Sequence, residues 1–256
     1  MQLSCAGDEE GYRKSLPSPN QKTTNQMQTA LVTGANRGLG KETARQLAEK
    51  GFKVILTSRS EAGRAVAEEL RAAGHEVDFH QLDVADGQSI AELTDYLAEN
   101  YEYLDVLINN AGIHYDTFQN TLNADFSIVE EALRVNTIGP WRVSNALMPL
   151  LKNSSAGRIV NVSSSSGSFV DSWPGTPAYS VSKCALNMLT LKMAADLEGT
   201  NVKINSVCPG WVRTAMGGEN ALRDVSEGAA SIIWAALIPD DGPSGGFFRD
   251  GQSMSW

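Results

Sequence analysis

Short apolar runs alternate with amphipathic stretches through most of the chain. The apolar runs predict buried strands over residues 29–33, 53–58, 76–81, 105–109 and 158–163. The stretches between them carry apolar residues at helical spacing and predict helices over residues 41–50, 61–73, 86–100 and 125–151. Strands that alternate with helices are typical of parallel sheets. We therefore predict one α/β domain, a doubly wound parallel sheet with helices on both faces.

The second half of the chain continues this pattern less regularly. Asn136 and the pair Gly139-Pro140 fall inside the stretch 125–151 and predict a local distortion of that helix. Three further elements are predicted: a helix from about Ala178, a helix over 224–237 and a last edge strand over 245–251.

The beginning of the chain differs from the rest. Residues 1–28 are polar, contain Pro17 and Pro19, and show neither helical nor strand periodicity. We expect a flexible extension there and place the folded domain at residues 29–256.

The first predicted strand leads directly into a glycine-rich turn, Gly34-Ala-Asn-Arg-Gly38-Leu-Gly40, and then into a helix. This order suits a dinucleotide pyrophosphate, because glycines let the backbone approach it and a helix N-terminus offers N–H groups and partial positive charge. The spacing departs from the usual Gly-x-Gly-x-x-Gly, and a glycine turn without a ligand is the alternative. The candidate cofactor contacts are Gly34, Asn36, Arg37, Gly38, Leu39 and Gly40.

The residues after the second predicted strand indicate which dinucleotide binds. An acidic residue there would bond the ribose 2′-hydroxyl of NAD, whereas this chain has Ser58 and Arg59, with Arg37 in the glycine turn. Two guanidinium groups without a carboxylate favour the 2′-phosphate of NADP(H); the alternative is that both are solvated surface residues. Asp83 and Val84 follow the third strand, where the Asp83 carboxylate would either meet the adenine amino group or cap the next loop.

The fourth predicted strand ends in the small and amide residues Asn109-Asn110-Ala111-Gly112. Such residues would leave room for a cofactor and fix the loop through side-chain hydrogen bonds. Asn110, Ala111 and Gly112 are therefore candidate cofactor contacts, and a turn-forming Asn pair is the alternative.

Tyr179 and Lys183 are spaced one helical turn apart. On the helix predicted from about Ala178 they share a face, so a phenol and an ammonium can occupy one small site. A nearby cation lowers a tyrosine pKa from its usual value of about 10. Ser164, at the end of the strand 158–163, would hydrogen-bond the oxygen that Tyr179 protonates. The alternative is an exposed helix pair after a serine-rich loop.

Composition narrows the classes of function. The 256 residues carry a formal net charge of −9 without a Lys/Arg cluster, which argues against a nucleic-acid partner. Cys5, Cys184 and Cys208 are odd in number and lack metal-ligand spacing, so we expect neither disulfides nor a metal site and interpret all three as bystanders. The apolar runs are too short to span a bilayer and no signal peptide is recognisable. We expect a cytoplasmic protein without membrane contact.

Together these motifs resemble the short-chain dehydrogenase/reductase family. The glycine turn, Asn-Asn-Ala-Gly, Asn136, Ser164, Tyr179-x-x-x-Lys183 and Cys208-Pro-Gly occur in that family's order and approximate spacing, from about Thr29 to the C-terminus. The stretch 205–214 is similar to the carbonyl reductase branch, although the chain lacks the long insertion that some of those enzymes carry between the serine and the tyrosine.

The resemblance implies a Rossmann-like domain that uses NADP(H) to reduce a carbonyl reversibly, the hydride coming from the cofactor. Tyr179 would be the general acid, and Lys183 would lower its pKa and bind the nicotinamide ribose. Ser164 would polarise the carbonyl, with Ser163 as the alternative because the serine run leaves the alignment open by one residue. Asn136 would support a water relay to Lys183. The residues expected to wall the nicotinamide are Pro209, Gly210, Val212 and Thr214.

The substrate is predicted only as a class. The segment 211–223 that would roof the site is short, and Tyr115, Trp173 and Trp211 would give an aromatic wall suited to an apolar aldehyde or ketone. The alternatives are an alcohol dehydrogenase, a 3-oxoacyl-thioester reductase and a non-catalytic NADP(H)-binding regulator. Apolar residues beyond one core stripe on the helices 129–150 and from Ala178 also lead us to expect a homodimer or homotetramer.

Overall fold

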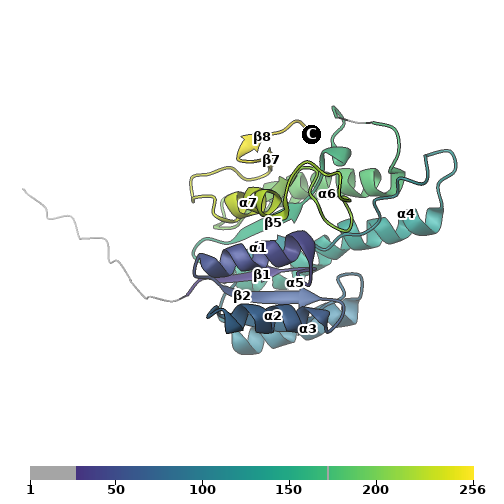
Figure 1. The fold of residues 1–256 in the computed structure, drawn as a ribbon. Coiled ribbons are helices and arrows are strands. Elements are labelled where there is room, and N and C mark those ends of the chain that lie inside the picture. Colours follow the sequence, from purple (N-terminus) through teal and green to yellow (C-terminus); the bar gives the residue numbers. More distant parts are fainter. Residues whose placement is uncertain (1–26, 172) are drawn as a thin grey trace, which may run out of the picture.

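The computed structural model describes residues 27–171 and 173–256, so the predicted extension 1–28 lies almost wholly outside the described residues. The described residues form an eight-stranded sheet with the order β3-β2-β1-β4-β5-β6-β7-β8 (Figure 1). The strands are β1 (Thr29–Val32), β2 (Lys53–Ser58), β3 (Val77–Gln81), β4 (Val106–Asn109), β5 (Arg158–Val162), β6 (Lys203–Val207), β7 (Phe247–Arg249) and β8 (Gln252–Ser253). Every pair of neighbours is parallel except β7 with β8. The strand order reverses between β1 and β4, and at such a switch point the carboxyl ends of the strands leave a crevice for a ligand.

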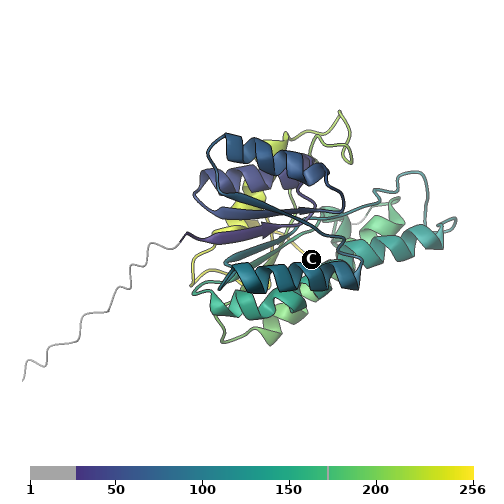
Figure 2. The same cartoon turned by 90° about the horizontal axis from the view of Figure 1, so that it is seen from below.

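Helices cover both faces of the sheet (Figure 2). One face carries α1, α2 and α7, and the other carries α3, α5 and α6. Their bounds are α1 (Gly38–Glu49), α2 (Ala62–Ala72), α3 (Gly87–Asn100), α5 (Gly139–Asn153), α6 (Pro177–Asp196) and α7 (Val225–Ala236). The predicted Rossmann-like α/β fold is confirmed.

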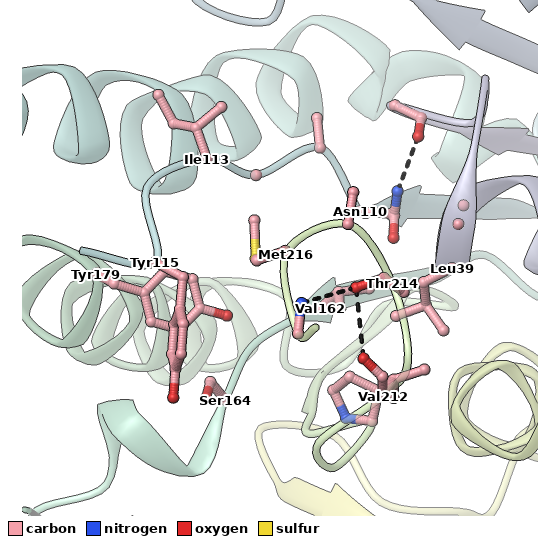
Figure 3. A pocket seen from close by; sticks show the side chains of 18 of the residues that line it. Leu39, Asn110, Ile113, Tyr115, Val162, Ser164, Tyr179, Val212, Thr214 and Met216 are labelled. Atoms are coloured by element: carbon pink, nitrogen blue, oxygen red, sulfur yellow. Dashed lines mark hydrogen bonds between the residues drawn. The ribbon is translucent and has the colours of Figure 1, made fainter. Parts of the chain in front are cut away.

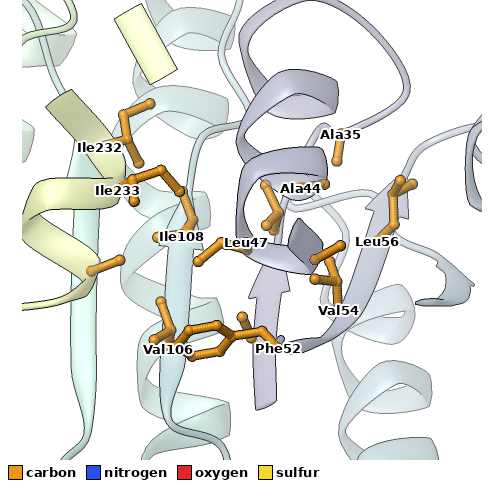
Figure 4. Packing of buried hydrophobic residues seen from close by; sticks show 14 of the residues in the cluster. Ala35, Ala44, Leu47, Phe52, Val54, Leu56, Val106, Ile108, Ile232 and Ile233 are labelled. Atoms are coloured by element: carbon orange, nitrogen blue, oxygen red, sulfur yellow. The ribbon is translucent and has the colours of Figure 1, made fainter. Parts of the chain in front are cut away.

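Successive strand residues point into two different cores. Val54 and Leu56 of β2 pack beneath α1 and α2, in the same core as Leu47 and Ile108 (Figure 4), whereas Ile55 packs into the core on the opposite face. A strand covered on both faces needs apolar residues at consecutive positions, which explains the continuous apolar runs in the sequence. The two cores hold the strand ends rigidly, and the loops that form the site are attached to those ends.

The stretch 125–151 forms three elements rather than one helix. They are α4 (Phe126–Leu133), the π-helical turn η1 (Arg134–Ile138) and α5. The distortion expected around Asn136 is therefore present, as a π-helical turn. Pro140 lies in the first turn of α5, where a missing N–H is tolerated.

The last strand differs from the prediction. The prediction of a single edge strand over 245–251 is wrong. The strand β7 ends at Arg249, and the chain then turns back into the antiparallel β8, which forms the edge. Asp250 and Gly251 make this turn with φ values of 52° and 76°. An Asp-Gly pair favours such a hairpin turn, which accounts for the reversal.

Candidate active site

The glycine turn between β1 and α1 is packed against the loop that follows β4. Gly34 and Gly38 have φ values of 66° and 52°, in the left-handed region that favours glycine. A Cβ at Gly34 would lie 2.9 Å from the Cα of Ala111, and one at Gly40 would collide with the Asn110 side chain. The N-cap residue Arg37 makes no side-chain bond to α1, so the first N–H groups of the helix can meet an anion. The turn therefore fits the pyrophosphate of a dinucleotide.

Asn110 and Thr33 tie the two loops together across the switch point. The Asn110 amide donates to the carbonyl oxygens of Thr33, at 2.8 Å, and Gly34, at 3.2 Å. The Thr33 hydroxyl accepts the N–H groups of Asn110 and Ala111, each at 3.0 Å. The Asn110 side chain thus fixes the two loops to each other, as expected for an amide at this position. Asn110 also lines the cavity together with Ala111 and Gly112.

Arg37 and Arg59, the candidate 2′-phosphate contacts, are exposed and line the same cavity. Ser58 does not line it, because this residue is buried and its hydroxyl donates to the Ser60 carbonyl at 2.7 Å. Ser60 occupies the cavity wall instead. The structure therefore does not support a Ser58 contact and does bring both arginines to the site.

Asp83 caps its own loop, which was one of its two predicted roles. Its Oδ1 accepts the Ala85 N–H at 2.9 Å, and its backbone N–H donates to the Ser89 hydroxyl at 3.0 Å. Asp83 is absent from the cavity wall, whereas Leu82 and Val84 on either side of it line the cavity.

Three of the four candidate catalytic residues, Ser164, Tyr179 and Lys183, line this cavity, and Figure 3 shows Ser164 beside Tyr179. Tyr179 lies in the first turn of α6 and Lys183 one turn later, and Ser164 faces them from the end of β5. Ser163 also borders the cavity, but its hydroxyl donates to Asn187 Oδ1 at 2.6 Å and the residue is 2% exposed. The Ser164 hydroxyl is the one next to Tyr179.

Lys183 is held by the strand that carries the serines. Its ammonium donates to the Val162 carbonyl at 2.8 Å and lies 5.6 Å from the centroid of the Tyr179 ring. Burial lowers the pKa of Lys183 to about 8, so most of the side chain is charged at neutral pH. A buried ammonium with donors left over can bind hydroxyl groups of a ligand in the cavity.

The pKa of Tyr179 is shifted in the direction opposite to the one expected. Burial raises the pKa of the Tyr179 phenol well above its usual value, Cys208 and Tyr115 add to the rise, and the Ser164 hydroxyl opposes it. The expected lowering by Lys183 does not contribute to this shift, in which burial has the largest effect because it penalises the charged phenolate. Tyr179 is therefore protonated at neutral pH, which is the form that a proton donor needs.

Asn136 lies in η1 and is fully buried. Its Oδ1 accepts the Ile113 N–H at 2.9 Å, and its Nδ2 donates to the Ile113 carbonyl and to the Ser182 hydroxyl, both at 3.0 Å. Asn136 does not line the cavity. It links the loop after β4 to α6, and a water relay through it stays a prediction.

The cavity measures about 1060 Å³, enough for a dinucleotide together with a small substrate. Every residue expected to wall the nicotinamide lines it: Pro209, Gly210, Val212 and Thr214. The aromatic candidates Tyr115, Trp173 and Trp211 line it as well, and Tyr115 packs edge-on against Tyr179 with ring centroids 5.3 Å apart. The sequence did not single out four apolar wall residues, Ile113, Val135, Val162 and Met216. The only signal for them was their position inside or beside segments that carry motifs.

Cys208 is more than a bystander. Its Sγ accepts the Ser165 N–H at 3.3 Å and an Arg249 guanidinium N–H at 2.9 Å. The thiol thereby joins the end of β6 to β7 and to the short 3₁₀ helix η2 (Ser165–Gly167). Cys5 lies outside the described residues. Within the part of the chain that the structure describes, no group of three His, Cys, Asp or Glu side chains could hold a metal ion.

Comparison with known proteins shows to which family the chain belongs. A family model described as short chain dehydrogenase matches residues 28–224. The chain belongs to the short-chain dehydrogenase family. Carbonyl reductase (NADPH) 1 of Bos taurus is 36% identical, in an alignment covering 89% of this chain and 98% of that enzyme. (+)-Neomenthol dehydrogenase of Arabidopsis thaliana is 34% identical over 87% of this chain and 96% of its own length.

Solved structures of this family have the same fold. The NADPH-bound carbonyl reductase from chicken fatty liver matches with a TM-score of 0.82 and 28% identity, over 90% of this chain and 100% of that one. The chain therefore resembles the carbonyl reductase branch in fold as well as in sequence. Its alignment with the bovine enzyme spans 276 positions while covering 89% of a 256-residue chain, so the bovine enzyme has residues that this short-chain dehydrogenase lacks.

Proposed function

We propose that this short-chain dehydrogenase reduces an apolar aldehyde or ketone to an alcohol with NADPH, and that Tyr179 donates the proton. The observation that carries the proposal is the convergence of Ser164, Tyr179 and Lys183 on a cavity whose other end is the glycine turn. A carbonyl placed against Tyr179 would be within reach of a proton donor and of a dinucleotide held by the turn.

The proposed cofactor is NADP(H), which supplies the hydride when it is bound. The turn from Gly34 to Gly40 would hold the pyrophosphate, and Arg37 and Arg59 would pair with the 2′-phosphate. Support comes from Arg59 and Ser60, which stand directly after β2 where an enzyme that uses NAD would have an acidic residue, and from the named use of NADPH by carbonyl reductase (NADPH) 1 of Bos taurus.

The polar residues of the wall would have different roles. The Tyr179 hydroxyl would donate its proton to the carbonyl oxygen as negative charge develops there, and the Ser164 hydroxyl would donate a second hydrogen bond to the same oxygen. The Lys183 ammonium would bind the ribose and stabilise the phenolate that the proton transfer leaves behind. Reversal of the same steps would oxidise an alcohol.

The proposed substrate is apolar because apolar side chains surround the carbonyl position. Tyr115, Trp173, Trp211 and Met216 come from three different loops at the mouth of the cavity. Trp211 and Met216 are 49% and 42% exposed, so a ligand that covers them removes apolar surface from water. An alcohol dehydrogenase, a 3-oxoacyl-thioester reductase and a non-catalytic NADP(H)-binding regulator are the alternatives.

Parallel assays of NADPH and NADH consumption test the proposal. The substrate panel should contain an aromatic aldehyde, a bulky ketone and an acetoacetyl thioester. We expect turnover with NADPH and with the apolar aldehyde or ketone. Binding of NADPH without turnover of any carbonyl would favour the regulator, and preferential turnover of the thioester would favour the thioester reductase.

We also propose that the protein forms a homo-oligomer through α5 and α6. Trp141 on α5 and Met188 on α6 are each 51% exposed and border a groove of about 530 Å³ between these helices. A symmetric dimer would bury these side chains against their copies. Sedimentation that shows only the 27.5 kDa species would contradict it.

The location of the protein stays a prediction, with the cytoplasm expected. Among the described residues, no helix has the length and apolarity needed to cross a bilayer.

A further inference from the structure

The first turn of α6, which carries Tyr179, has no cap from its own neighbourhood. Thr176 precedes the helix with φ 47° and ψ 47° and makes no side-chain bond to the helix N–H groups. Pro177 has no N–H to satisfy. The N–H groups of Ala178 and Tyr179 therefore need acceptors from elsewhere in the chain.

Asp116 supplies both acceptors from a distant loop. Its Oδ2 accepts the Ala178 N–H at 2.9 Å, and its Oδ1 accepts the Tyr179 N–H at 3.0 Å. The residue is 0% exposed and lies 63 positions before Tyr179. Burial acts to raise the pKa of Asp116, but the bonds from Gln119, Ala178 and Tyr179 hold it below its usual value. The side chain is therefore an ionised carboxylate at a helix N-terminus, where negative charge is favoured.

The loop that carries Asp116 also forms the part of the cavity wall beside the proton donor. Tyr115, the preceding residue, packs edge-on against the Tyr179 ring at 85°. Gln119 supports the carboxylate from outside, because its Nε2 donates to Asp116 Oδ2 at 2.9 Å and its Oε1 accepts the Asp125 N–H at 2.9 Å. Asp125 in turn caps α4. A continuous set of hydrogen bonds and a ring contact thus connects the start of α4, the Tyr115 wall and the first turn of α6.

We propose that Asp116 is a positioning residue that fixes the Tyr179 hydroxyl relative to the substrate wall. The inference rests on the proposed function and adds a residue to it. Asp116 does not line the cavity and acts through the backbone of Tyr179. A cap from the adjacent residue would hold only the helix, whereas a carboxylate from the loop after β4 also fixes the position of the proton donor relative to the Tyr115 wall. A displacement of about 1 Å in such a group can lower a rate by about 100-fold.

The test replaces Asp116→Asn, which keeps the shape but turns one acceptor oxygen into an NH₂ group that faces a helix N–H. We expect kcat for the best ketone to fall by about 10- to 100-fold, while NADPH binding, followed by its fluorescence, is unchanged. The ratio of kcat in H₂O to kcat in D₂O should rise, because proton transfer becomes more limiting. A loss of folded enzyme would lower kcat without changing this ratio.

Asp86→Asn is the matched control. Asp86 Oδ1 accepts the Gln88 N–H at 3.0 Å, so the variant also removes a carboxylate cap, but from α3, which carries no proposed site residue and has no part in the contacts of Asp116. It should keep the kcat and the solvent isotope effect of the wild type.

If the wild type reduces the ketone, two results would overturn this inference and leave the proposed function intact. One is an Asp116→Asn enzyme with wild-type kcat. The other is an Asp116→Asn enzyme whose kcat falls with no change in the ratio of kcat in H₂O to kcat in D₂O. If Asp116→Asn does not fold, Gln119→Met removes the outer support of the carboxylate. A smaller loss of kcat with a raised D₂O ratio is then expected, and wild-type values would overturn the inference. A wild type that reduces no carbonyl refutes the proposed function and this inference together.

Discussion

Ser163 and Ser164 allow a crossed test of the active-site geometry. The Ser163 hydroxyl is buried and donates to Asn187 Oδ1 at 2.6 Å, while the Asn187 amide donates to the Gly167 carbonyl at 3.2 Å. Ser163→Ala leaves a buried acceptor without its partner, which costs about 1–3 kcal/mol. For a domain of this size each kcal/mol lowers Tm by about 2–4 °C. We therefore expect Ser163→Ala to melt several degrees lower and to keep its kcat.

Ser164→Ala should show the reverse. The Ser164 hydroxyl accepts the Ser166 N–H at 3.1 Å and bonds the Ser166 hydroxyl at 3.2 Å, so the variant loses a local cap worth about 0.5–1 kcal/mol. If this hydroxyl stabilises the developing charge on the carbonyl oxygen, its removal lowers kcat by about 10²- to 10³-fold.

Thermal melts and initial rates at saturating NADPH, run on both variants in one buffer, make the comparison. Each variant is the control for the other, because both remove one hydroxyl from adjacent positions. A Ser163→Ala enzyme that is stable but inactive, beside an active Ser164→Ala enzyme, would refute the geometric assignment.

Three further predictions concern the proton donor and the cofactor. Tyr179→Phe should abolish reduction in a rate assay and retain NADPH binding by fluorescence; residual wild-type turnover would place the acid elsewhere. Arg59→Ala should weaken NADPH by about 10- to 100-fold, the loss of a charge-assisted bond of about 1.5–3 kcal/mol, while NADH changes little. The control is Arg64→Ala, which removes an exposed guanidinium paired with Glu61 and should leave both affinities unchanged. Equal losses of affinity for NADPH and for NADH in Arg59→Ala would disprove recognition of the 2′-phosphate by Arg59. Because the pKa of Lys183 is about 8, the charged form is present below that pH and is lost above it, so kcat/KM should decline above about pH 8; a level profile to pH 10 would contradict a role for the ammonium.

The sequence predicted those parts of the site that are formed by residues close together along the chain. The spacing of Tyr179 and Lys183 is a property of one helix, and Gly34 to Gly40 is a single turn between a strand and a helix. Such features follow from helical periodicity and from the conformational freedom of glycine. They could therefore be predicted before the sheet was known.

Features that depend on packing could not be predicted in this way. Whether Ser163 or Ser164 faces the cavity depends on Asn187 of α6, and Ser58 turns away because its hydroxyl bonds Ser60. The acceptor for the first turn of α6 is Asp116, 63 positions earlier, and no local pattern connects the two. The pKa of Tyr179 is raised chiefly by burial, and the sequence does not reveal the degree of burial.

Isotope transfer tests the central claim most directly. The protein is incubated with an apolar ketone and, in separate reactions, NADPH deuterated at each of the two C4 positions, and the alcohol is analysed by mass spectrometry. We expect deuterium at the carbinol carbon from one of the two cofactors, with consumption of NADPH in equal amount. Alcohol that carries no deuterium from either cofactor, or NADPH that is bound and never consumed, would contradict the account.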